Sequence, residues 1–154
     1  MIYLGIDPGA SGGLASIVTE GGATAMPATE RDVWEWIRLW SSVGGKGNAF
    51  AVIEKVGGYI AGAAHPGSAM FKFGQSYGGL RMALVAAGIP FDEITPQRWQ
   101  KEIGIAPRKQ TESKGQFKNR LKAKAQQLFP KVKVTLATAD ALLIAEYARR
   151  THRA

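Results

Sequence analysis

Two short apolar runs of this chain each end directly on a carboxylate, and this feature constrains the fold more than any other. The segment IYLGID ends on Asp7, and the segment AFAVIE ends on Glu54. Apolar runs of about four to eight residues bounded by turn residues are typical of buried β-strands. A charge at the end of such a strand is costly unless something binds it. The two runs therefore predict a sheet that carries two carboxylates at its edge.

The rest of the sequence alternates between strand and helix patterns. The turn DPGASGG separates the first run from a second strand at 14–18, and a short third strand follows at 23–26. The remaining elements are expected in this order: a helix after Thr29, the strand that ends on Glu54, a helix at 69–87, a strand in IPFDEIT, and helices in PQRWQKEIG, at 113–128 and in TADALLIAEYARR. This order predicts one α/β domain, residues 1–154, with a mixed five-stranded sheet flanked by helices.

A third carboxylate is expected near the other two. Thr138 is the predicted N-cap of the final helix, which puts Asp140 in its first turn. Neighbouring strands lie about 4.8 Å apart, so carboxylates at the ends of adjacent strands can share a cation. A helix that starts at the same edge would add Asp140 as a third carboxylate. Mg²⁺ prefers such oxygen ligands, and two metal ions about 3.5–4 Å apart can both activate a water and neutralise a phosphate.

Each of these acids also has a plainer interpretation. Asp7 precedes Pro8 and Gly9 and is compatible with a simple turn. Glu54 is compatible with a charge that leaves the sheet into solvent. Asp140 is compatible with a favourable charge near a helix N-terminus, which stabilises the helix by about 1 kcal/mol or less.

The charge balance indicates a polyanionic partner. Lys and Arg number 20 against 12 Asp and Glu, a net charge of +8, which is typical of nucleic-acid-binding domains. Cations are densest in RKQTESKGQFKNRLKAK, where they flank the apolar seam of the helix at 113–128. A generally basic, solvated surface is the alternative. The residues predicted to contact DNA are Arg98, Lys101, Arg108, Lys109, Lys114, Lys118, Arg120, Lys122 and Lys124.

Composition disfavours several other classes. The chain has no cysteine, so disulfides and thiolate metal sites are excluded. The start MIYLGID has no basic and apolar leader pattern, and no apolar run approaches the ~18 residues of a membrane span. We therefore expect a cytoplasmic protein without a membrane partner.

The motifs together resemble one known family. YLGIDPG, AVIE and TADALLIAEYARR, in this order, are similar to the acidic motifs of the RuvC family of Holliday junction resolvases, in the RNase H-like superfamily. FGQSYGGLRMAL and ITPQRWQK resemble the helix after the glutamate strand and the V-x-P-x-x-W stretch of phage-type members. The resemblance covers nearly the whole chain and implies an RNase H-like fold.

The resemblance also implies an activity and roles for particular residues. Members of the family are metal-dependent endonucleases that nick two strands of a four-way DNA junction symmetrically. Two ions, Mg²⁺ or Mn²⁺, would occupy each active site, with Asp7 bridging them, Glu54 holding one and Asp140 the other. Family members insert an aromatic side chain at the junction centre, for which Tyr59 is the first candidate and Phe71 the second; packing within a loop is the alternative role.

A homodimer is expected, because two symmetric nicks need two active sites and a two-fold assembly matches a two-fold junction. The helix at 69–87 is the expected interface. It contains Gly74, Gly78 and Gly79, and each interior glycine costs about 1 kcal/mol relative to alanine. Close approach by a neighbouring element or by a second subunit would compensate for this cost.

One position departs from the family pattern. The family usually carries Asp or His three residues before the helix aspartate, where this chain has Ala137. A methyl group cannot bind a cation, and three explanations stay open: an inactivated variant, a natural member that works with three ligands and water, or a shifted alignment. Ala137 also motivates an alternative function, a non-catalytic branched-DNA-binding protein. A further alternative, independent of Ala137, is an RNase H-like nuclease with another branched substrate.

Overall fold

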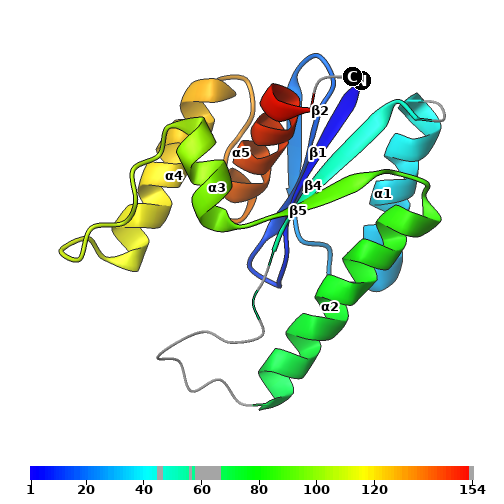
Figure 1. Ribbon diagram of the computed structural model, residues 1–154, viewed down its shortest axis with the longest axis horizontal. Coiled ribbons are helices and arrows are strands. Elements are labelled where there is room, and N and C mark those ends of the chain that lie inside the picture. Colours follow the sequence, from blue (N-terminus) through cyan, green and yellow to red (C-terminus); the bar gives the residue numbers. More distant parts are fainter. Residues whose placement is uncertain (45–46, 56, 58–66, 153–154) are drawn as a thin grey trace.

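Figure 1 shows the computed structural model of the chain, which describes residues 1–44, 47–55, 57 and 67–152. Five strands and five helices follow one another in these residues: β1 (Ile2–Asp7), β2 (Gly13–Ile17), β3 (Gly21–Ala25), α1 (Glu30–Gly44), β4 (Ala49–Glu54), α2 (Gly67–Ala86), β5 (Phe91–Ile94), α3 (Pro96–Ile103), α4 (Lys114–Leu128) and α5 (Leu136–Thr151). The predicted order of elements is confirmed.

The strands form one mixed sheet in the order β3-β2-β1-β4-β5. β1, β2 and β3 are an antiparallel meander, whereas β4 runs parallel to β1 and β5 runs parallel to β4. The mixed five-stranded sheet flanked by helices is therefore confirmed. Because β1, β4 and β5 are parallel, their C-terminal ends lie at the same edge of the sheet.

Helices cover both faces of the sheet (Figure 1). α5 lies directly on one face with α3 and α4 beside it, and α1 and α2 cover the other face. Side chains alternate between two cores along the central strands. Phe50 and Val52 of β4 pack in the core with α5, whereas Ala51 and Ile53 pack in the core with α1 and α2.

A glycine in β1 lets α5 lie close to the sheet. A Cβ atom at Gly5 would lie 2.1 Å from the carbonyl oxygen of Ala141 and 2.3 Å from the backbone nitrogen of Ala145. Any side chain at this position would push the helix away. This contact fixes the distance between α5 and β1, and therefore the position of the other α5 residues over the sheet.

One local prediction is wrong. α5 begins at Leu136 with Thr135 as its N-cap, three residues before the predicted cap Thr138. The reason is a reciprocal capping box, in which the side chains of Thr135 and Thr138 each accept a hydrogen bond from the other's backbone N–H. Of the two compensations expected for the interior glycines of α2, close approach by another element of the chain is not seen, since a Cβ at Gly74, Gly78 or Gly79 meets nothing within 4 Å among the described atoms. This leaves a second subunit, which the sequence suggested as the alternative.

Within the described ranges, none of the helices combines the length and the apolar character needed to cross a bilayer.

Candidate active site

Asp7 and Glu54 lie side by side at the ends of two neighbouring parallel strands. The register pairs Ile6 of β1 with Ile53 of β4, so the next residue on each strand is one of the two acids. Ile6 and Ile53 belong to the core under α1 and α2. Because side chains alternate along a strand, both acids point to the opposite face, toward α5.

Asp140 approaches the same place from α5. Its side chain is 6% exposed, and its Oδ1 is buried without a hydrogen-bond partner among the described residues. The sequence predicted Asp140 in the first turn of the final helix. Because α5 begins at Leu136, Asp140 lies in the second turn instead. The favourable effect of a helix N-terminus on an acid falls off within the first turn. That plainer interpretation therefore does not account for a buried aspartate at this position.

The three carboxylates influence one another electrostatically. The pKa of Asp7 is raised to about 8, first by burial and then by the charges of Asp140 and Glu54, against an opposing effect of Lys118. Burial raises the pKa of Glu54 as well, a hydrogen bond from Trp99 lowers it, and the charge of Asp140 raises it again, with a net rise. The three acids form a cluster in which negative charge is unfavourable until a cation neutralises it.

Lys118 of α4 supplies a cation to this cluster. Its ammonium group donates a hydrogen bond to Oδ2 of Asp140 and forms an ion pair with it. Burial lowers the pKa of Lys118, but the charge and hydrogen bond of Asp140, with the charges of Asp7 and Glu54, outweigh burial and raise the pKa overall. The sequence predicted Lys118 as a DNA contact on the helix surface. In the structure its ammonium group is turned to the carboxylates instead.

The donor chemistry of the cluster suits a divalent cation, although its members are not already arranged as ligands. In the part of the chain that the structure describes, no group of three acidic or histidine residues is placed to hold a metal ion. Carboxylate oxygens are nevertheless the ligands that Mg²⁺ prefers. A buried acceptor such as Oδ1 of Asp140 also needs a partner. An ion bound to Asp140 would take over the position that Lys118 now holds.

Ala137 lies three residues before Asp140 on α5 and so shares a face of the helix with it. It is partly buried and lines an open groove that also contains Asp7. The structure thus brings Ala137 to the candidate site, where its methyl group offers no ligand atom.

The groove over Asp7 has a volume of about 720 Å³. Lys114 and Lys118 of α4 line one side of it, and Phe73 of α2 lines another. The loop after β1 forms its floor, where Gly9 has a φ of 104° and a Cβ would lie 2.9 Å from the Phe73 ring. Only glycine fits this position without strain. The groove therefore joins two lysines, the carboxylate of Asp7 and one aromatic ring in a single open surface.

The predicted DNA contacts lie in several environments. Tyr59 is outside the described residues. Phe71 is 67% exposed near the start of α2. All nine predicted cations have exposed or partly exposed side chains, as the sequence suggested. Besides Lys118 and Arg120, they are Arg98, Lys101, Arg108, Lys109, Lys114, Lys122 and Lys124.

Arg120 was predicted to contact DNA, and in the structure its guanidinium makes hydrogen bonds to other residues of the chain. Two of its nitrogens donate to the two carboxylate oxygens of Glu112, both at 3.0 Å. A third donates to the carbonyl oxygen of Ala106 at 2.9 Å, and the guanidinium lies 4.9 Å from the centroid of the Phe117 ring. These contacts tie the loop before α4 to the helix, so Arg120 has a structural role in this arrangement.

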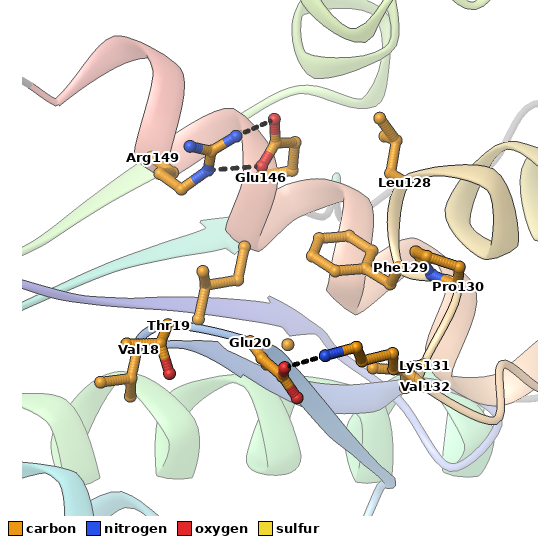
Figure 2. A pocket seen from close by; sticks show the side chains of 12 residues that line it. Val18, Thr19, Glu20, Leu128, Phe129, Pro130, Lys131, Val132, Glu146 and Arg149 are labelled. Carbon is orange, nitrogen blue, oxygen red and sulfur yellow. Dashed lines mark hydrogen bonds and ion pairs between the residues drawn. The ribbon is translucent and has the colours of Figure 1, made fainter.

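A second pocket, of about 400 Å³, lies between the β2–β3 turn and the connection from α4 to α5 (Figure 2). Glu146 in its wall is buried and accepts two hydrogen bonds from Arg149, at 2.7 and 2.8 Å, and one from Arg150 at 2.7 Å. Burial raises the pKa of Glu146, but the two arginines outweigh burial and lower it overall. Its charge is therefore satisfied within α5, away from the groove over Asp7.

The mixed sheet and its flanking helices form an RNase H-like α/β fold, which carries acidic residues at the ends of two of its central strands. Two similar solved structures are Thermus thermophilus RuvC and T. thermophilus RuvC in complex with Holliday junction substrate. Both have a TM-score of 0.63 and cover 97% of this chain and 96% of the other, at 16% and 15% identity. The chain thus has the fold of RuvC. No protein-family model matches the sequence, and no curated protein matches it.

Sequence reasoning missed three features of the site. It did not connect Trp99 with Glu54, it did not pair Lys118 with Asp140, and it did not bring Phe73 to the loop after Asp7. The distance along the chain explains the first two cases, because nothing in the local pattern near either partner indicates the other. Phe73 had one usable signal, since it lies two residues from the candidate Phe71 on the helix that follows the glutamate strand.

Proposed function

We propose that this chain is a metal-dependent endonuclease that resolves four-way DNA junctions by paired symmetric nicks. The observation that carries the proposal is the convergence of Asp7, Glu54 and Asp140 from three distant segments on one edge of the sheet, next to a groove with two lysines. The likeness of its fold to T. thermophilus RuvC in complex with Holliday junction substrate supports branched DNA as the partner. The sequence motifs favour a phage-type member.

The three carboxylates would hold two Mg²⁺ or Mn²⁺ ions, with Asp7 shared between them. Ions of this kind supply a nucleophilic water at neutral pH and neutralise the charge that develops on the phosphate. Lys114 and Lys118 line the groove and would hold the phosphate of the strand to be cut. The ammonium group of Lys118 would be free for this contact if a metal ion, rather than the lysine, neutralised Asp140.

A homodimer formed through α2 supplies the second active site in this proposal. Phe71, Met82 and Val85 are 67%, 60% and 59% exposed, although they are apolar. Gly74 and Gly78 lie on the same exposed side of the helix, where they leave room for close contact by another backbone. The chain provides no such neighbour within the described residues, and a second copy of α2 fits both observations.

Ala137 favours one alternative, a branched-DNA-binding protein that does not cut. The test compares the chain with Ala137→Asp on a synthetic four-way junction in Mn²⁺, with Ala137→Asn as the uncharged control of similar shape and Asp7→Asn as the inactive control. We expect Ala137→Asp to nick two strands symmetrically at least ~10-fold faster than the parent chain, which is the size of effect typical of groups that support a metal site.

The outcomes separate the candidate functions. If neither the chain nor Ala137→Asp cuts while both bind the junction, the binding protein is correct and the nuclease is wrong. Equal cutting by both would mean that three carboxylates and water suffice. Preferential cutting of flaps or forks in competition with the junction would favour an RNase H-like nuclease with another branched substrate.

A further inference from the structure

The indole of Trp99 makes a direct contact with the candidate site. Its Nε1–H donates a hydrogen bond to Oε2 of Glu54 over 2.7 Å, across 45 residues of sequence. Trp99 is 0% exposed, and it is among the largest completely buried side chains of the described structure. A fully buried tryptophan that bonds a carboxylate at the end of a strand is an unusually rigid partner for that carboxylate.

The path of the chain explains why the two residues meet. Glu54 pairs with Ile94 in the register of β4 and β5. Thr95 then occupies the N-cap position of α3, which starts at Pro96, and Trp99 follows one turn into the helix. α3 therefore turns back over the end of β4, and Trp99 enters the core with α5. The position of the indole is set by the core and not by the carboxylate.

We propose that Trp99 is a positioning residue for the metal site. Its hydrogen bond holds Oε2 of Glu54 and thereby sets the orientation of the carboxylate, so that Oε1 would remain available to a cation. This inference rests on the proposed function, because it requires that Glu54 binds metal. Groups that orient a metal ligand typically change metal affinity by about 10- to 100-fold when they are removed.

The chain offers a matched control. Trp40 of α1 is partly buried, and its Nε1 is buried without a hydrogen-bond partner among the described residues. It packs edge-on against Trp36, with ring centroids 5.7 Å apart, in the core on the other face of the sheet. Trp40→Phe therefore removes the same atoms as Trp99→Phe and breaks no contact with Glu54.

The test measures Mn²⁺ binding by calorimetry, without DNA, for the full chain, Trp99→Phe, Trp40→Phe and Glu54→Gln. We expect Glu54→Gln to weaken binding most, Trp99→Phe to raise the Kd by about 10-fold and Trp40→Phe to leave it unchanged. Thermal unfolding of each variant separates a loss of metal affinity from a loss of folding.

The result distinguishes two kinds of failure. If Glu54→Gln binds Mn²⁺ as tightly as the parent chain, the metal site of the proposed function is wrong. If Glu54→Gln weakens binding while Trp99→Phe and Trp40→Phe both leave it unchanged, the metal site stands and the positioning role of Trp99 is overturned.

The parent chain gives a second measurement that does not depend on folding of Trp99→Phe. Its four tryptophans give four indole N–H signals in an ¹H–¹⁵N spectrum, and single Phe substitutions at Trp34, Trp36 and Trp40 identify the Trp99 signal by elimination. We expect Mg²⁺ to shift the Trp99 signal in step with binding and to leave the Trp40 signal in place. A Trp99 signal that does not move at saturating Mg²⁺ contradicts the proposal.

Discussion

The ammonium group of Lys118 and the carboxylate of Asp140 form an ion pair that joins α4 to α5. Lys118 is 36% exposed, whereas Asp140 is 6% exposed and has a second oxygen without a partner among the described residues. The lysine thus brings positive charge into a cluster of three acids from the solvent side. A divalent cation at the same place would make the lysine dispensable for the stability of the cluster.

Lys118→Met tests whether the lysine replaces a metal ion. Removing the lysine leaves the buried charge of Asp140 uncompensated, so we expect the free energy of unfolding to fall by about 1–3 kcal/mol. The fall is no larger because the partly exposed lysine is already screened by water. Thermal unfolding without metal measures this loss. Mg²⁺ should then raise the Tm of Lys118→Met more than that of the parent chain.

Lys114→Met is the matched control for this prediction, since Lys114 is exposed, lies one turn earlier on α4 and lines the same groove. It should leave the Tm unchanged. If Mg²⁺ stabilises Lys118→Met no more than it stabilises the parent chain, the ammonium group and the ion do not compete for one position.

Asp7→Asn is expected to stabilise the metal-free protein at pH 8. The folded protein raises the pKa of Asp7 from its ordinary value of 3.8 to about 8, so the folded state holds a proton that the unfolded chain has released between these values. Stability is therefore lost as the pH rises from about 4 to about 8. Because asparagine carries no charge, we expect Asp7→Asn to raise the free energy of unfolding at pH 8 by at least ~1 kcal/mol, which corresponds to about 2–4 °C in Tm.

Thermal unfolding in a chelator from pH 4 to pH 8 checks this prediction. The gain from Asp7→Asn should shrink as the pH falls, because Asp7 becomes protonated in the unfolded chain as well. A gain that is constant with pH would mean that the effect does not come from titration of Asp7.

The cations of the basic segment should divide into two functional groups. Lys109 and Lys114 are exposed, and replacing either with alanine should weaken junction binding and reduce the slope of log affinity against log salt by about 0.9 for each lost phosphate contact. Arg120→Ala should instead lower the Tm, because Arg120 holds Glu112 and the carbonyl oxygen of Ala106. Binding at three salt concentrations and thermal unfolding separate the two effects. A Lys109→Ala slope equal to that of the parent chain would remove this lysine from the interface.

Gly78→Ala should have opposite effects on the isolated chain and on a dimer. A Cβ at Gly78 meets nothing within 4 Å, so alanine should stabilise α2 by about 1 kcal/mol in the monomer. In a dimer that packs two α2 helices closely, the same methyl group should weaken association. Sedimentation equilibrium and thermal unfolding at low concentration measure the two effects. Unchanged association, or a parent chain that stays monomeric at micromolar concentration, would contradict the proposed interface.

Much of the arrangement could be predicted from local patterns. The runs IYLGID and AFAVIE predict buried strands that end on Asp7 and Glu54, and the structure has β1 and β4 at these bounds. The period of two along a strand also determines that both acids share a face once the strands are neighbours. Residues close in sequence encode such features, because strand and helix periodicity depend only on which neighbours are apolar.

The partners of the acids were decided by the tertiary structure alone. Lys118 and Asp140 are 22 residues apart, and Trp99 and Glu54 are 45 residues apart. Each contact depends on how a helix packs against an element far away in the chain, which in turn depends on close approaches such as that of Gly5 to α5. The sequence alone therefore determined which carboxylates end the strands. Only packing decided that a lysine pairs with the aspartate of α5 and that a tryptophan holds one of the strand-end acids, because burial and charge act between atoms that are close in space and not in sequence.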